Sequence, residues 1–232
     1  MVKDHLPDVN PERIVLDFES AAIQAFKNGF PRAQVSLCQF HFSQSLNRKL
    51  NNVGKKWAYE NDEQFNILIK CINSLSYVPV GDVIENFHML CEKFDEDDDA
   101  VSQFLSYVET TYIHGQRRRN GTYKDPLFRI QLWDHFEDGL NCLEKTTNCV
   151  EGYHNALQNT FRCDHPSMPD FLSGIKKDIN IHKFNLRKVL MGEIEPQNRK
   201  YQLVAQNLAA AVGSYHTTED KYDYLRRVAH QQ

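Results

Sequence analysis

One carboxylate stands where an open parallel sheet would place an active site. Asp17 directly follows the short apolar run Ile14–Leu16. Active sites of open parallel sheets lie at the carboxyl ends of their strands, so a carboxylate there can hold a ligand or a metal ion. The alternative is structural, because Asp17 could cap the next helix while Glu19 stabilises its first turn. The residues alone favour this structural alternative.

A cysteine and a histidine form a second candidate group at the end of a second apolar stretch. Cys38 and His41 have half the spacing of a zinc site. Cys163 and His165 are the only comparable pair that could supply the other half. Nothing in the spacing demands a metal, so a packed thiol and a hydrogen-bonded imidazole are the favoured interpretation. Zinc is therefore not expected from the sequence.

The third group belongs to a predicted helix that begins near Asn148. Glu151 follows that residue by three positions, which makes a capping box in front of an apolar-periodic helix. The functional alternative is a metal-ligating Glu151, with His154 and Asn155 near the same helix face. By physical reasoning alone, the capping box is the better explanation.

Four basic residues lie in a Gly-, Asn- and Pro-containing segment that reads as a loop. They are candidate phosphate contacts, although a solvated basic loop is the commoner explanation in an acidic chain. These residues are Arg117, Arg118, Arg119 and Lys124.

The elements that must position these residues begin with a strand, helix, strand and helix. Apolar runs and helical periodicity predict strands at 14–16 and 33–40, each followed by a helix, which makes a parallel βαβ unit with a right-handed crossover. Beyond about residue 55 the pattern is helical. Two parallel strands make a poor sheet alone, so either further strands are missing upstream or the pair depends heavily on packing against helices. An exposed edge at 14–18 would favour self-association or marginal stability.

Bulk properties indicate an ordinary globular protein. The chain has 232 residues, 41% hydrophobic and 25% charged, with a formal net charge of -4. No apolar run is long enough for a membrane span or a signal-peptide core. Six dispersed cysteines are expected to be reduced thiols, and the expected location is nuclear, or nuclear and cytoplasmic, and not secreted. A free-standing duplex-DNA binder is usually basic, so the net negative charge of this chain argues against its binding DNA without a partner.

Four ordered segments together resemble the transposases of Mutator-like elements (MULE). Those segments are RIVLDFESAAIQAF, FPRAQVSLCQFHFSQSLNRKL, W-x-H-F followed by TTNCVEGYHNAL, and HPSMPDFL. The resemblance implies a predominantly helical α/β protein, with part of a ribonuclease-H-like core and a large helical insertion. It divides the chain into a core half (11–55), an insertion (56–145), core-completing helices (146–195) and a helical tail (196–232).

The resemblance also implies a chemistry. Asp17 matches the second aspartate of an Asp-Asp-Glu triad, Cys38 and His41 match the family's C-x-x-H element, and Glu151 matches the candidate third carboxylate. Such a triad binds two Mg²⁺ or Mn²⁺ ions for phosphodiester exchange on DNA; no small-molecule cofactor is implied. The first aspartate would lie upstream of residue 11, and Asp4 and Asp8 stand in polar, Pro-broken sequence that is no substitute.

In this fold the first aspartate normally bridges both metal ions. Without it, we expect a transposase fragment or domesticated relic that performs no strand transfer alone. One alternative is a DNA- or protein-interaction module that uses the helical region. Another is a nuclease that obtains its missing strand from a second chain.

Overall fold

The computed structural model describes residues 9–95, 97–161, 165–193 and 199–231. The chain divides into two compact units, one made of residues 1–146 and 203–232 and the other of residues 147–202. The described residues are mostly helical and include a two-stranded parallel sheet whose strands are separated by a helix. The expected mostly helical α/β composition is therefore confirmed.

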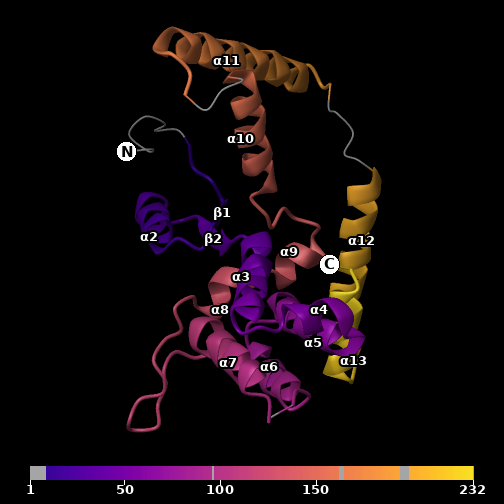
Figure 1. Ribbon diagram of the computed structural model, residues 1–232. Helices are drawn as coiled ribbons and strands as arrows, with labels where there is room; N and C mark the ends of the chain where they lie inside the picture. Colours follow the sequence, from indigo (N-terminus) through magenta and orange to yellow (C-terminus); the bar gives the residue numbers. More distant parts are fainter. Residues whose placement is uncertain (1–8, 96, 162–164, 194–198, 232) are drawn as a thin grey trace. The chain divides into compact units, whose positions relative to one another are not determined.

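The sheet is formed by β1 (Arg13–Leu16) and β2 (Gln34–Leu37), joined by α2 (Ser20–Gly29) (Figure 1). In the parallel register, Leu16 pairs with Leu37. The two strands therefore end side by side, as the strand–helix–strand pattern predicted. The residues that follow them share one edge of the sheet.

The second strand is shorter than its sequence pattern predicts. Strand pairing ends at Leu37, and Cys38 is already the N-cap residue of α3 (Gln39–Asn52). The predicted extension to Phe40 is wrong because helical periodicity begins earlier than the alternating pattern suggested. Phe42, Leu46 and Leu50, four residues apart, are all buried and hold α3 against the core.

The remaining elements between α3 and residue 146 are short helices, as the periodicity predicted. Two begin at aspartate caps: Asp62 accepts hydrogen bonds from Gln64 and Phe65, and Asp98 accepts from Ala100 and Val101. Asp98, in an acidic run of the sequence, is thus the start of α7 (Asp99–Val108). The elements are α4 (Lys56–Asn61), α5 (Glu63–Ser74), the 3₁₀ turn η1 (Leu75–Tyr77), α6 (Val83–Cys91), α7 (Asp99–Val108), the π-helical turn η2 (Glu109–Ile113), α8 (Ile130–Trp133) and α9 (Phe136–Leu140).

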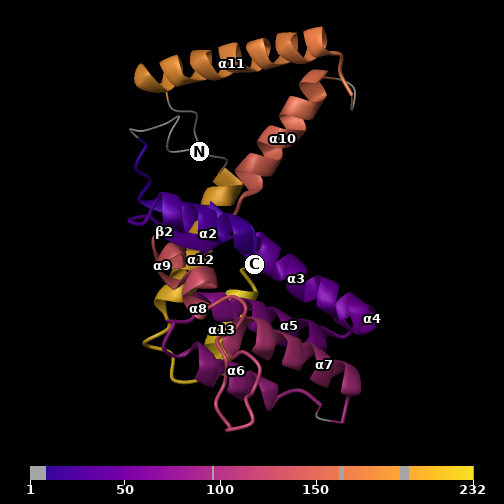
Figure 2. The ribbon, with the colours of Figure 1, turned by 90° about the vertical axis from the view of Figure 1, so that its left-hand side faces the viewer.

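The first unit is completed by the C-terminal helices, whose partner the sequence did not reveal. They are α12 (Arg199–Gly213), which enters this unit at Leu203, and α13 (Lys221–Ala229). Helix α13 packs along α5 (Figures 1 and 2), and the buried Tyr224 hydroxyl donates to the main-chain oxygen of Tyr77. The core therefore joins residues far apart in the sequence and extends from Ile23 to Ala229.

The second unit contains α10 (Asn148–Phe161) and α11 (Met168–Leu190). The rings of Phe161 and Phe171 stack at 5.4 Å, and Gly174 permits this approach because a Cβ there would lie 2.3 Å from the Phe161 ring. Tyr153 donates a hydrogen bond to Asp178 at 3.0 Å. Among the described residues, no helix is both long enough and apolar enough to cross a membrane.

Candidate functional site

The strand ends bring Asp17 and Cys38 to the same edge of the sheet. Each residue directly follows its strand, and the Cys38 amide donates to the Leu16 carbonyl at 2.7 Å, which extends the ladder by one bond. The N-cap position of α2 belongs to Glu19, whose side chain makes no capping hydrogen bond.

Helix α3 adds an imidazole to this pair. His41 lies in the first turn of α3, and its Nδ1 is 3.1 Å from a carboxylate oxygen of Asp17. The ligand atoms of Asp17, Cys38 and His41 all lie within 4.8 Å of one another. Across residues 9–95, 97–161, 165–193 and 199–231, this is the one cluster of three or more His, Cys, Asp or Glu side chains close enough to share a metal ion.

The three side chains differ in exposure. Cys38 is fully buried, the His41 side chain is 21% exposed and the Asp17 side chain is 58% exposed. The cluster is therefore reached from solvent on its carboxylate side, while its thiol is fixed in the core.

Two rings of a packed aromatic cluster are sequence neighbours of Asp17 and His41. Phe18 follows Asp17, and Phe42 follows His41. Phe42 stacks on Trp133 with ring centroids 5.1 Å apart and meets Tyr112 edge-on at 5.0 Å, while Phe18 meets Phe128 edge-on at 4.9 Å. Aromatic side chains that pack in this way leave little freedom to the neighbouring backbone, so the cluster holds both ligand-bearing segments in place.

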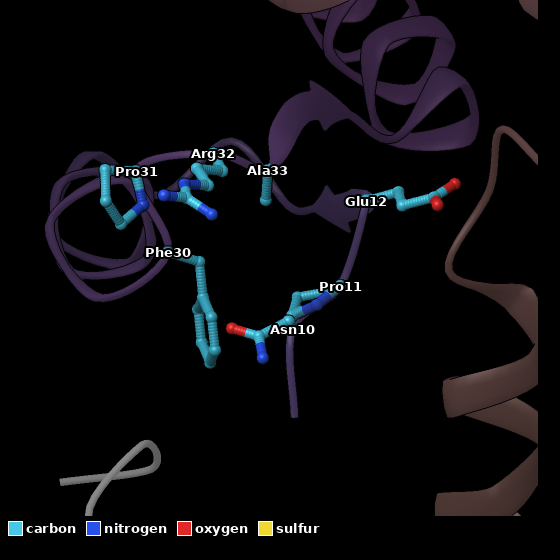
Figure 3. Close-up of a pocket in the computed structure, with 7 residues that line it drawn as sticks. All are labelled: Asn10, Pro11, Glu12, Phe30, Pro31, Arg32 and Ala33. Atoms are coloured by element: carbon cyan, nitrogen blue, oxygen red, sulfur yellow. The ribbon is translucent and has the colours of Figure 1, made fainter. Parts of the chain in front are cut away.

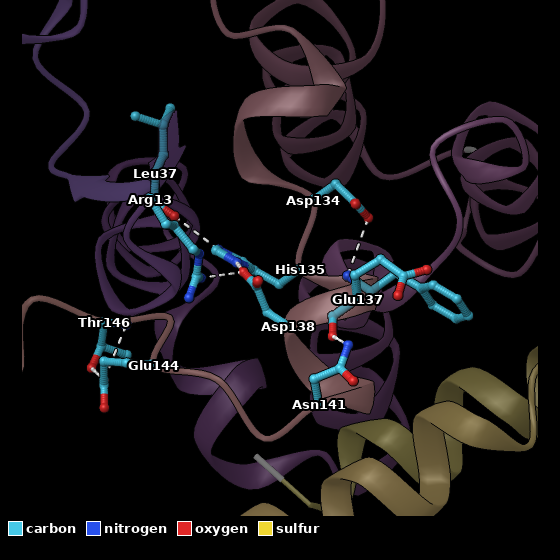
Figure 4. Close-up of polar contacts among 10 residues, drawn as sticks. Arg13, Leu37, Asp134, His135, Glu137, Asp138, Asn141, Glu144 and Thr146 are labelled. Carbon is cyan, nitrogen blue, oxygen red and sulfur yellow. Dashed lines mark hydrogen bonds and ion pairs between the residues drawn. The ribbon is translucent and has the colours of Figure 1, made fainter. Parts of the chain in front are cut away.

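A buried polar network holds the backbone next to Cys38, the third residue of the cluster (Figure 4). His135 precedes α9 and is fully buried, with Nδ1 2.7 Å from the Asp138 carboxylate and Nε2 2.8 Å from the Leu37 carbonyl. Arg13 of β1 also donates to Asp138. The network therefore ties α9 to both strands and fixes the backbone immediately before Cys38. Sequence reasoning found no role for His135, although its three-residue spacing from Asp138 was a usable signal.

The pKa of one carboxyl group beside this network, that of Asp134, lies well above its ordinary value. Burial raises the pKa of Asp134 to about 7; the Phe136 amide opposes this change by donating to the carboxylate, and the neighbouring Asp138 and Glu137 charges reinforce it. Burial also lowers the pKa of Lys145, whose carbonyl accepts from the Gln39 amide at 2.9 Å. The segment after α9 thus contacts the first turn of α3.

Glu151 belongs to the second unit. It is exposed in the first turn of α10, on the same helix as His154 and Asn155, which are also exposed. The helix begins at Asn148, so Thr147 stands at the N-cap position that the sequence interpretation gave to Asn148. Of the second cysteine–histidine pair, Cys163 lies outside the described residues.

The basic segment after η2 is an extended ribbon that turns back on itself. The backbones of Arg117 and Tyr123 form an antiparallel bridge, and Gly121 supplies the positive φ of 83° for the tight turn. Gly115 allows the two arms to close, since a Cβ there would meet the Asp125 carbonyl oxygen at 2.2 Å. The four basic side chains on it are exposed: Arg117, Arg118, Arg119 and Lys124.

A pocket lies at the opposite edge of the sheet. It opens beside the amino ends of both strands (Figure 3), where ligands of parallel sheets seldom bind. It gathers no cluster of ligating side chains. Its lining consists of Asn10, Pro11, Glu12, Phe30, Pro31, Arg32 and Ala33.

Comparison with known protein families, with curated proteins and with solved structures finds no match to this chain.

Proposed function

We propose that the chain is a transposase-derived domain of the Mutator-like class that acts on DNA without autonomous strand transfer. The observation that supports this proposal is the contact between Asp17 and the C-x-x-H pair at the carboxyl ends of β1 and β2. These are the residues through which the sequence resembles that class. In this proposal, β1, α2 and β2 belong to a ribonuclease-H-like core and α4–α9 to its helical insertion.

The chemistry of the cluster is the reason for excluding autonomous strand transfer. Two-metal phosphodiester exchange needs several hard oxygen ligands around a pair of Mg²⁺ ions. In the part of the chain that the structure describes, the ligand cluster at the strand ends has one carboxylate, Asp17, beside a thiol and an imidazole. Glu151 is the second carboxylate that the resemblance implies. A single Asp17 with soft neighbours is a poor bridging site for two magnesium ions.

Nicking of supercoiled plasmid in Mg²⁺ or Mn²⁺ tests this part of the proposal. The wild-type chain is expected to leave the plasmid intact, as are Asp17→Asn and Glu151→Gln. Glu19→Gln is the matched control because Glu19 is exposed two residues from Asp17. Divalent-ion-dependent nicking that Asp17→Asn abolishes and Glu19→Gln preserves would show an active nuclease and overturn the proposal.

The basic ribbon is the DNA-contacting surface in this proposal. Arg117, Arg118 and Arg119 are adjacent and exposed on a ribbon with a tight turn, so their guanidinium groups can reach backbone phosphates. A protein that uses several such contacts loses affinity steeply as salt rises. The same ribbon is what favours the second candidate function, an interaction module that binds DNA without any catalytic ancestry.

Fluorescence anisotropy with a labelled duplex measures this contact. Replacing the three arginines by alanine is expected to weaken binding and to reduce the salt slope by about 3, one unit for each lost phosphate contact. Alanines at Lys176, Lys177 and Lys183 remove the same charge from exposed positions on α11 and form the control. Equal loss of affinity in both triple variants would show a nonspecific charge effect, and absence of duplex binding by the wild type would contradict a DNA function.

A further inference from the structure

We infer that Asp17, Cys38 and His41 bind a single zinc-type transition-metal ion. The donor set is one thiolate, one imidazole and one carboxylate, which are the three ligand types that proteins use for Zn²⁺. Mg²⁺ and Ca²⁺ take oxygen ligands instead, and a thiolate selects against both. The inference stands on the cluster's geometry and does not depend on the proposed function.

The distances fit a tetrahedral ion. Zinc–ligand bonds of 2.0–2.3 Å imply separations of roughly 3.3–3.7 Å between the ligand atoms. The Asp17 oxygen and His41 Nδ1 are 3.1 Å apart, and all three ligand atoms lie within 4.8 Å of one another. Even a pair at the 4.8 Å limit would need to close by only about 1–1.5 Å to reach these separations.

The protein fixes the ligands before any ion binds. Cys38 is held by the β-ladder bond to Leu16 and lies at the N-terminus of the 14-residue helix α3. That helix end favours negative charge, which suits a thiolate and a carboxylate. Phe42 anchors the turn that carries His41. Two anionic ligands balance the charge of one divalent ion, so a filled site is neutral.

Three protein ligands leave one tetrahedral position for water or an external ligand, as in zinc sites that keep an exchangeable position. The exposed Asp17 carboxylate places the site within reach of solvent. A zinc ion held here would also occupy the carboxylate that magnesium chemistry needs, so zinc and a two-magnesium centre exclude each other at Asp17.

Cobalt substitution tests this inference without any activity assay. The full chain is stripped with a chelator and titrated with Co²⁺, which gives a thiolate-to-metal charge-transfer band only if a cysteine is bound; Zn²⁺ then displaces the cobalt. We expect one ion per chain, with the band retained in excess Mg²⁺. Asp17→Asn and His41→Gln should each weaken Zn²⁺ binding by about 100-fold or more, since even outer-shell changes cost 10–100-fold.

The cysteine variants decide whether the site is the one described. Cys38→Ser should abolish the band, whereas Cys149→Ser, which alters an exposed thiol on α10, should leave it unchanged. Since Cys38 is buried and its replacement can impair folding, the exposed Asp17→Asn variant provides the independent measurement. No cobalt band in the wild type, or a band and Zn²⁺ affinity that Asp17→Asn leaves unaltered, would overturn the inference. Failure of DNA binding would leave the inference unaffected, because the basic ribbon contributes no ligand to the cluster.

Discussion

The Nε2 of His135 lies 2.8 Å from the main-chain oxygen of Leu37, although the two residues are 98 positions apart. A carbonyl oxygen only accepts, so the imidazole donates in this contact. The other ring nitrogen of His135 contacts the Asp138 carboxylate, which also accepts a hydrogen bond from Arg13. His135 thus holds the last residue of β2 in place, directly before the candidate ligand Cys38.

Removing the Asp138 carboxylate should destabilise the protein, because that group links His135 to Arg13. Asp138→Asn removes the buried charge that Arg13 and His135 share, and loss of one partner from such a group costs about 3–5 kcal/mol. Urea unfolding measures the change. The exposed i,i+4 pair of Asp125 and Arg129 supplies the control, because Asp125→Asn should cost no more than about 0.5 kcal/mol. Equal effects would show that the buried network is no stronger than a surface pair.

The aromatic cluster predicts a sharp contrast between two neighbouring phenylalanines of α3. Phe42 is 1% exposed and stacks on Trp133, whereas Phe40 is 42% exposed. Phe42→Ala should lower the free energy of unfolding by about 3–5 kcal/mol through lost burial and an unfilled cavity. Phe40→Ala should change it by less than about 1 kcal/mol. Thermal and urea denaturation compare the two, and similar losses would contradict the packing described for α3.

Asp134 predicts that stability falls as pH rises. Burial raises the pKa of this carboxyl to about 7 in the folded protein, from 3.8 as the ordinary value. Between these two values the folded state holds a proton that the unfolded state has lost, so stability decreases from about pH 4 to pH 7 and then levels off. Asp134→Asn removes this decrease, so between pH 4 and pH 8 the variant should gain up to about 4 kcal/mol of stability relative to the wild type. Unfolding curves with the same pH dependence in both proteins would exclude the effect.

The free side of β1 predicts self-association. The Glu12 and Leu16 carbonyls accept from β2, so with strand alternation the backbone groups of Arg13 and Val15 point away from β2. Val15→Pro removes an outward-facing amide without breaking the β1–β2 ladder, and edge strands tolerate proline. If this edge pairs between chains, sedimentation should show concentration-dependent association that Val15→Pro abolishes. A wild-type chain that is monomeric at all concentrations would disprove edge pairing.

The local part of the site could be predicted from sequence because it depends on periodicity. The Ile14–Leu16 run and the helical pattern after Glu19 give the strand, helix and strand, and parallel pairing then brings Asp17 and Cys38 to one edge. The approach of His41 to Asp17 was not foreseen, since it depends on where α3 begins. The alternating pattern around Cys38 concealed that start.

The long-range part could not be predicted because it depends on contacts without a local signature. The contact of His135 with Leu37 and that of Tyr224 with Tyr77 join segments about 100 residues or more apart. Periodicity shows that such helices have an apolar face but not which surface receives it. The partner of α13 therefore became known only from the structure.

The bond between Tyr224 and Tyr77 has a consequence for how the protein is made. A ribosome adding about 5–20 residues per second would take roughly 7–30 s to extend the chain between them, a separation of 147 residues. Throughout that interval the surface of α5 that receives α13 has already emerged and lacks its native cover. The nascent chain therefore exposes a defined apolar surface to chaperones until α13 has been made and covers it.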